Sequence, residues 1–236
     1  MKIETLPDAE AVARAGAAFT AAEARAAVAA RGRFIMAVSG GRTPWTMLRA
    51  LADEPMPWAD VHVVQVDERV APAGHADRNL THLRESLLAH TPLLPEQVHA
   101  MPVESSDLQA ACERYALTLR QIAGSPAVLD LAHLGLGPDG HTASLVPGDP
   151  VLDMTTADVA LSGIYQGHRR MTLTYPLLNR SRRILWLVTG HEKADMLPRL
   201  RDGDRAIPAG RISSEHSVVL ADSEAAAHLR PQPSRR

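Results

Sequence analysis

The chain has 236 residues, of which 45% are hydrophobic and 22% charged, and its formal net charge at pH 7 is -2. At roughly 100–200 residues per domain, this length fits one large domain or two small ones and allows a sizeable buried core. A near-neutral, globular composition of this kind argues against nucleic acid or a membrane as a partner. It leaves any oligomeric partner unspecified.

The chain shows no sign of export or membrane insertion. Its start lacks a charged-then-apolar signal pattern, and no apolar run nears the ~18 residues needed to span a bilayer. The one cysteine, Cys112, cannot form an internal disulfide, which fits a reducing cytoplasm. It lies in a helical pattern, so we expect a small buried hydrophobe rather than a nucleophile. These features predict a cytoplasmic protein.

The first half of the chain alternates helical and strand patterns. An Ala-rich stretch over residues 8–30, followed by Gly32, predicts a long helix with a C-terminal glycine. The apolar run 34–38 predicts a strand buried on both faces, and a helix with Thr43 as its cap follows to about residue 51. Further elements are predicted at 61–66 (strand), 80–89 (helix) and 106–122 (helix, capped by Ser105 and Ser106 and ended by Gly124).

The second half continues the alternation. Strands are predicted at 128–134, 157–162, 169–174, 184–189 and 217–221. A short helical turn is predicted at 176–181, a helix after Lys193, and a last helix capped by Asp222. This order predicts an α/β fold with a mostly parallel sheet and helices on both faces. No linker or repeat divides the chain, so residues 1–230 are predicted to form a single domain and 231–236 a disordered tail.

A glycine pair connects the strand 34–38 to its helix. Two glycines before a helix start, Gly40 and Gly41, let successive backbone N–H groups converge into a nest for an anion, phosphate above all. No Gly-Lys-Ser/Thr follows, so this is not a Walker sequence. From these residues alone, an anion site and an ordinary strand-to-helix turn are equally favoured.

Charged residues follow the strand 61–66. Asp67, Glu68 and Arg69 are unsuited to simple burial because of their desolvation cost. Four histidines lie further on without metal-ligand spacing, and we read them as surface residues: His75, His82, His90 and His99. These histidines therefore predict no metal site.

The strand 128–134 ends in a turn rich in glycine that presents Asp139 and His141. The spacing of its glycines matches a dinucleotide fingerprint, but Asp139 would stand where a pyrophosphate should bind, and Pro147 interrupts any following helix. The chain has no Gly-x-Ser-x-Gly elbow and no zincin site.

An imidazole next to a carboxylate suggests general-base chemistry. With an ordinary pKa near ~6.5, imidazole accepts a proton from water at neutral pH, and a positioned base contributes roughly 10²–10⁴ in rate. Because no covalent nucleophile is evident, His141 activating water against an electrophilic carbonyl is the most economical mechanism. The residues alone leave a capping or packing role for His141 equally open.

Three motifs together resemble, in order, the main signatures of the 6-phosphogluconolactonase family: residues 39–44, residues 67–69 with Asn79, and residues 135–145. Weaker matches lie at 170–174, Gly190 with Lys193, and 207–209. The resemblance implies a Rossmann-like parallel sheet and hydrolysis of the δ-lactone of 6-phosphogluconate in the pentose phosphate pathway, without a metal or organic cofactor.

The resemblance also implies roles for individual residues. His141 would activate water without a covalent intermediate, and Asp139 would orient or polarise it. Asp67 would contact sugar hydroxyls or fix Arg69. The residues expected to bind substrate are Ser39, Gly40, Gly41, Arg42, Thr43, Asp67, Arg69, Asn79, Gly140, Arg170 and Lys193.

The sequence departs from the common family pattern in three places. Arg42 and Arg78 stand where Ser is frequent, and they would add positive charge near the phosphate cradle. Val146 replaces a typical Phe and would loosen the pocket edge. Two alternatives are an amino-sugar phosphate deaminase, whose Asn-Glu pair after the Asp-Gly-His core is missing here, and a sugar-phosphate sensor, for which the Asp139 and His141 pair would be superfluous.

Overall fold

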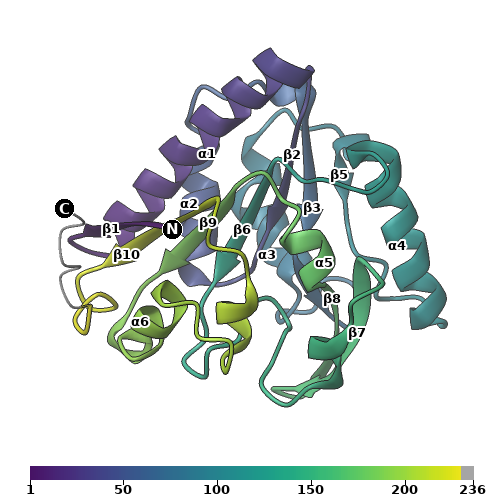
Figure 1. The fold of residues 1–236 in the computed structure, drawn as a ribbon. Helices are drawn as coiled ribbons and strands as arrows, with labels where there is room; N and C mark the ends of the chain where they lie inside the picture. Colours follow the sequence, from purple (N-terminus) through teal and green to yellow (C-terminus); the bar gives the residue numbers. More distant parts are fainter. Residues whose placement is uncertain (230–236) are drawn as a thin grey trace.

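Seven strands form the central sheet, and every pairing in it is parallel. The computed structural model describes residues 1–229 (Figure 1). The strand order is β1-β10-β9-β6-β2-β3-β5. The bounds are β1 Lys2–Leu6, β2 Phe34–Val38, β3 Val61–Gln65, β5 Val98–His99, β6 Leu131–Gly135, β9 Ile184–Val188 and β10 Ser217–Asp222. The predicted α/β class with a mostly parallel sheet is confirmed.

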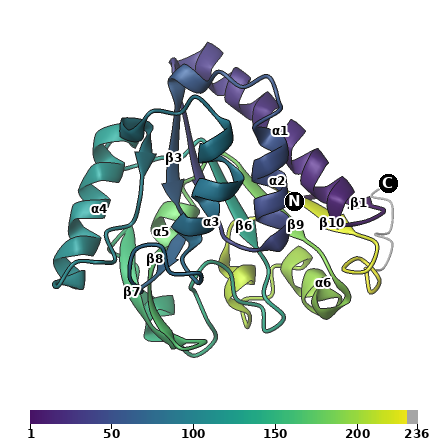
Figure 2. The same cartoon turned by 180° about the vertical axis from the view of Figure 1, so that it is seen from behind.

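Helices cover both faces of this sheet, as Figures 1 and 2 show from opposite sides. One face carries α1 (Ala9–Arg31), α2 (Arg42–Leu51) and α3 (Asn79–Ser86), and the other carries α4 (Leu108–Ala123), α5 (Tyr175–Leu178) and α6 (Met196–Arg201). Successive residues of β2 belong to opposite core clusters, because side chains alternate along a strand. Short 3-10 helices lie at Trp58–Asp60, Leu88–His90, Pro95–Gln97, Pro150–Asp153, His191–Lys193 and Pro208–Arg211.

A second, three-stranded antiparallel sheet follows the order β4-β8-β7, from β4 (Asp67–Arg69), β8 (His168–Leu173) and β7 (Val159–Tyr165). Val66 is the switch point: its amide donates to Val38 of the main sheet, and its carbonyl accepts from Leu173 of β8. The chain therefore leaves the parallel sheet just before the charged residues. The register sets Arg69 opposite Arg170. Sequence periodicity did not reveal this second sheet.

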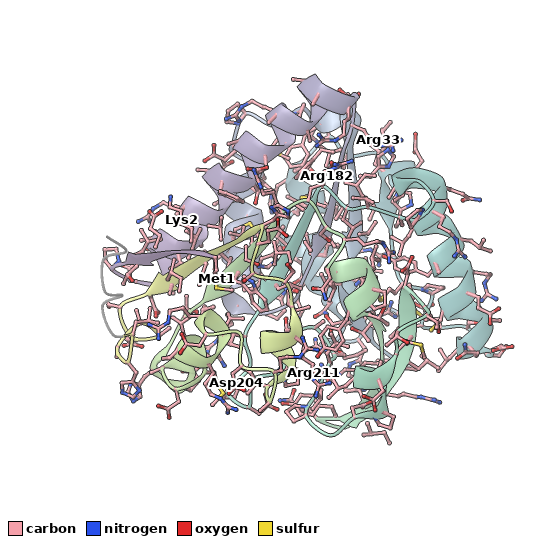
Figure 3. The ribbon with its side chains drawn as sticks, in the orientation of Figure 1. Met1, Lys2, Arg33, Arg182, Asp204 and Arg211 are labelled. Atoms are coloured by element: carbon pink, nitrogen blue, oxygen red, sulfur yellow. The ribbon has the colours of Figure 1, made fainter. Side chains whose placement is uncertain are left out.

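The cavity described below opens at the carboxyl ends of the parallel strands. Figure 3 shows Arg33 and Arg182 at the end of the sheet where β2 and β9 begin, with Asp204 and Arg211 toward the opposite end. Among residues 1–229, no helix is long and apolar enough to cross a bilayer.

Several predicted details of the helices hold. Gly32 ends α1 in the left-handed conformation, with a φ of 71°. Gly124 follows the end of α4. Cys112 is buried on α4, and burial raises the pKa of its thiol to about 11, so it is the buried hydrophobe that we expected.

Other details were wrong. Thr43 does not cap α2, whose N-cap is Gly41, and Asp107 rather than Ser105 or Ser106 caps α4. Asp222 accepts the amide of Ala225 but begins only turns in residues 223–229. The predicted tail at 231–236 lies outside the described residues. Strand β1 was missed because its side chains are largely exposed and show no apolar run.

The histidines read as surface residues fall into two groups. His75 and His90 are exposed, whereas His82 and His99 are partly buried. His82 stacks on Trp45 with ring centroids 3.9 Å apart, and His99 stacks on His62 at 5.3 Å. Aromatic stacking thus accounts for the two that departed from the prediction.

Candidate active site

A cavity of about 950 Å³ lies at the carboxyl ends of β2, β6 and β9, where open α/β sheets commonly bind ligands. Loops after these three strands form one side, and the antiparallel sheet supplies Arg69 and Arg170 from the other. Eleven of the predicted site residues line it: Ser39, Gly40, Gly41, Arg42, Thr43, Asp67, Arg69, Asn79, His141, Arg170 and Lys193. Segments far apart in the sequence therefore meet at one site.

The loop between β2 and α2 lines the cavity where the helix begins. Gly41 is the N-cap of α2, with a φ of 131° that favours glycine and no side-chain cap. The first turn of α2 therefore has amides free of intrahelical acceptors, at the positive end of the helix dipole. The hydroxyl of Thr43 is 2.7 Å from that of Thr189, which ties this loop to the end of β9.

Ser39 is held by two hydrogen bonds to the buried His133 of the neighbouring strand β6. The Ser39 amide donates to Nδ1 of His133 at 3.3 Å, and the Ser39 hydroxyl donates to the His133 carbonyl at 2.8 Å. Burial lowers the pKa of His133 to about 4, so the ring is neutral at pH 7 and its Nδ1 can accept. The Ser39 amide is thus engaged by His133, which leaves only the amides that follow it for the predicted anion nest.

A polar network connects Asp67 and Arg69 through Asn79. The Asn79 amide donates to the Asp67 carbonyl at 3.0 Å and to its carboxylate at 3.1 Å. Arg69 donates to the Asn79 oxygen at 2.8 Å and to the Asp77 carbonyl at 2.7 Å. The Asp67 carboxylate also accepts from Ser144 at 2.5 Å. Of the two roles expected for Asp67, fixing Arg69 is thus met only through Asn79, which accepts from Arg69 and donates to Asp67.

Arg78 does not add charge to the cradle, contrary to the prediction. Its side chain is buried, and its Nε lies 3.1 Å from the fully buried carboxylate of Glu68. Glu68 also accepts the backbone amides of Asn79 and Leu80, each at 2.8 Å. A second ion pair joins Arg78 to Glu104 at 2.9 Å. Arg78 and Glu68 thus fix the start of α3, and with it Asn79.

Arg170 is the buried cation of the cavity, with 4% of its surface exposed. One terminal nitrogen lies 4.0 Å from the Asp67 carboxylate, and the other donates to the Tyr165 carbonyl at 3.2 Å and to Gln166 at 3.3 Å. Its Nε has no hydrogen-bond partner in the described part of the chain. A largely desolvated guanidinium at the wall of a cavity is suited to bind an anionic ligand.

His141 and Asp139 form a close pair in the turn after β6. Nδ1 of His141 lies 2.6 Å from Oδ1 of Asp139, and the same oxygen accepts the His141 amide at 3.1 Å. Burial acts to raise the pKa of Asp139, but these hydrogen bonds and the His141 charge outweigh it, so the pKa lies below its usual value. An ionised carboxylate only accepts, so in the neutral form of the ring Nδ1 carries the hydrogen and Nε2 has the free lone pair. Within residues 1–229, Nε2 has no protein partner.

Glycine is required where this turn folds back on itself. A Cβ on Gly137 would lie 2.0 Å from Nδ1 of His141 and 2.7 Å from Oδ1 of Asp139. Gly140 adopts a φ of 82°, packs against Ile207 and accepts the Ala209 amide at 2.9 Å. Two predicted site residues, Asp139 and Gly140, are not among the residues that line the cavity. They shape the turn that presents His141.

Sequence reasoning missed several cavity residues. Gln166 comes from the β7–β8 hairpin, and its Gln-Gly turn between two strand patterns was an available hairpin signal. Glu192 stands 3.6 Å from the ammonium of Lys193. Others carried no local signal: Thr189, Asp222 and Glu224. Val146, expected at the pocket edge, is buried and is not a lining residue.

Comparison with known proteins agrees with this geometry. The family model described as glucosamine-6-phosphate isomerases/6-phosphogluconolactonase matches residues 7–221. A 6-phosphogluconolactonase from Synechocystis sp. is 36% identical over 214 residues, which covers 87% of this chain and 88% of the relative. The crystal structure of 6-phosphogluconolactonase from Thermotoga maritima has a TM-score of 0.83 at 26% identity and covers 94% of this chain and 98% of its own.

The fold extends beyond lactonases. A monomeric glucosamine-6-phosphate deaminase has a TM-score of 0.83 at 21% identity, covering 97% of this chain and 100% of its own, and at that identity it shows the fold alone. Lactonases and deaminases therefore cannot be told apart by fold, and the family is assigned from sequence relatives such as the Synechocystis lactonase. The chain therefore belongs to the 6-phosphogluconolactonase family, a group of lactone hydrolases within the glucosamine-6-phosphate isomerase superfamily.

Proposed function

We propose that the chain hydrolyses the δ-lactone of 6-phosphogluconate to 6-phosphogluconate, using water activated by His141. One observation carries the proposal: the His141 ring, the nest at the start of α2 and the side chains of Arg69, Arg170 and Lys193 line the same cavity. A base and an anion site in one cavity suit a substrate that carries both an electrophilic carbonyl and a phosphate.

The cavity also has a suitable size. Small-molecule sites occupy roughly 300–1,000 Å³, and this cavity of about 950 Å³ lies within that range. The amides at the start of α2 would bind the phosphate oxygens, with Arg42 and Lys193 beside them. The Asp67 carboxylate and the Asn79 amide would bind sugar hydroxyls.

The reaction needs no covalent intermediate. Nε2 of His141 takes a proton from water as the water oxygen attacks the lactone carbonyl carbon, giving a tetrahedral oxyanion that a cavity cation stabilises. When the oxyanion collapses, the bond to the ring oxygen breaks, and that oxygen takes the proton back from His141. The new carboxylic acid then ionises and releases one proton. Asp139 keeps Nδ1–H in place and stabilises the transient imidazolium.

Proton release from freshly prepared 6-phosphogluconolactone, corrected for spontaneous hydrolysis, tests this proposal. We expect His141→Ala to lose roughly 10²–10⁴ in kcat while it still binds 6-phosphogluconate. The exposed His90 offers a matched control, since His90→Ala should leave turnover unchanged. Unchanged turnover in His141→Ala would remove it as the base. Ammonia release from glucosamine 6-phosphate would instead support a deaminase.

A further inference from the structure

The hairpin between β7 and β8 reaches into the site. Tyr165 pairs with His168 across a two-residue turn, in which Gln166 and Gly167 have φ values of 49° and 82°. Both central residues are left-handed, as in the turns that match the twist of a hairpin. A left-handed Gln is unfavourable, and such strain is tolerated mainly where surrounding structure holds it. The hairpin places Tyr165 next to the turn that holds Asp139 and His141, more than twenty positions earlier in the chain.

Tyr165 contacts both members of the His141 and Asp139 pair. Its hydroxyl donates to Oδ2 of Asp139 at 3.3 Å, while Oδ1 of the same carboxylate holds His141. Its ring meets the His141 ring edge-on, with centroids 5.3 Å apart and an angle of 64° between planes. The carboxylate is thereby held at both oxygens, and the imidazole is packed on one side.

The same tyrosine is held by the buried cation. The Arg170 guanidinium lies 5.1 Å from the centroid of the Tyr165 ring, and Arg170 donates to the Tyr165 carbonyl at 3.2 Å. A cation over an aromatic face is favourable, and more so when desolvated. Tyr165 therefore links Arg170 on β8 to the turn after β6, two parts of the site that come from different sheets.

We infer that Tyr165 is a positioning residue for the reaction: it fixes the rotation of the Asp139 carboxylate and so keeps the Nδ1–H of His141 in place. This inference rests on the proposed function. Tyr165 is absent from the cavity lining, so it acts through Asp139 rather than on the substrate. Burial and the Asp139 charge raise the pKa of Tyr165, so the hydroxyl remains a donor at neutral pH.

A double-mutant cycle tests the inference, because residues that act through one another are not additive. Tyr165→Phe removes only the hydroxyl, and loss of one hydrogen bond of this kind should lower kcat about three- to ten-fold with KM changed less than twofold. In an Asp139→Asn background, the same substitution should cause no further loss. Equal losses in both backgrounds, or a change in KM alone, would overturn the role.

A control separates this role from general damage to the hairpin. Ile164 precedes Tyr165 on β7 and is 79% exposed. Ile164→Ala should therefore leave kcat and thermal unfolding unchanged. A loss of kcat equal to that of Tyr165→Phe would show that the hairpin, not the hydroxyl, matters.

A readout independent of turnover keeps the two proposals distinguishable. In NMR spectra, Nδ1–H of His141 should give a downfield proton signal protected from exchange by Asp139, and Tyr165→Phe should speed its exchange several-fold. If the unsubstituted chain has no lactonase activity, the proposed function fails, yet this signal still reports the contact. Unchanged exchange in Tyr165→Phe would refute the positioning role by itself.

Discussion

The backbone of Gly40 lies directly against the side-chain amide of Asn79: a Cβ on Gly40 would stand 1.9 Å from Oδ1 and 2.6 Å from Cγ of that residue. Asn79 cannot move aside easily, because Asp67 and Arg69 both bond to its amide group and Glu68 holds its backbone. Gly40 is thus required by a close approach rather than by backbone conformation. This contact joins the loop before α2, where we propose the anion nest, to the side of the cavity that carries Arg69 and Arg170.

Gly40→Ala should therefore damage both the site and the fold. Overpacking of this kind costs about 1–3 kcal/mol, so we expect a lower urea midpoint of unfolding and a KM increased at least tenfold. Gly135 is the matched control for stability, because a Cβ there would meet nothing within 4 Å. If Gly40→Ala unfolds like the unsubstituted chain and keeps its KM, Asn79 must move freely, and the rigid contact described above is wrong.

Lys193 should contribute to binding more than to the chemical step. Its side chain is 17% exposed, its ammonium lies 3.6 Å from Glu192, and the residue lines the same cavity as the loop before α2. Lys193→Ala should raise KM roughly tenfold, since it removes one charge-assisted contact to an anion, and should lower kcat less. Steady-state kinetics on freshly prepared 6-phosphogluconolactone measure both.

The carboxylate of Glu192, next to Lys193, provides a test with the opposite expected change in KM. Glu192 competes for the Lys193 ammonium, so Glu192→Gln should leave the cation freer and lower KM slightly. The effect should be small, because Glu192 is mostly exposed. An unaltered KM in Lys193→Ala would place that residue outside the binding site, whatever Glu192→Gln does.

His133 should make the protein less stable in acid. Its pKa is about 4 in the folded chain against an ordinary value of 6.5, because burial disfavours the charged ring. The unfolded chain therefore takes up this proton first as pH falls, and stability decreases from about pH 6.5 down to about pH 4. The shift corresponds to roughly 3 kcal/mol in total.

Urea unfolding at pH 7 and at pH 4.5 measures this effect. His133→Leu puts an apolar side chain that cannot titrate in the buried position, so its stability should fall less between the two pH values than that of the unsubstituted chain. His90→Ala, at an exposed position, should follow the unsubstituted chain. If His133→Leu loses as much stability between pH 7 and pH 4.5 as the unsubstituted chain, then His133 is not the group responsible for the acid destabilisation.

Local chemistry allowed much of the fold to be predicted. Strands β2 and β9 are continuous apolar runs, which are recognisable because both faces of a parallel sheet are buried. Asp139 and His141 lie two positions apart in one glycine-bounded turn, so their contact depends on few residues. The resemblance to lactonase signatures rests on such short, local motifs.

The cytoplasmic location and the domain bounds 1–230 stay predictions.

Burial and pairing over long distances escaped sequence reasoning. Arg78 was expected to face the cradle, yet it is buried on Glu68 and Glu104, since only the folded chain determines which charges find partners. The hydroxyl contact of Thr43 with Thr189 spans 146 positions. Thr43 was expected to cap α2, but the helix begins one residue earlier, at Arg42, so Thr43 lies inside its first turn.

By itself, the sequence determined most of the parallel strands and supplied the candidates for the base and the anion nest, because each is encoded within about a dozen neighbouring residues. Only the tertiary structure decided how they combine. The switch at Val66 into a second sheet sets Arg69 opposite Arg170 and brings Tyr165 onto Asp139. The physical reason is that these contacts join segments far apart in the chain. Neither hydrophobic periodicity nor motif spacing records which distant segments will pair.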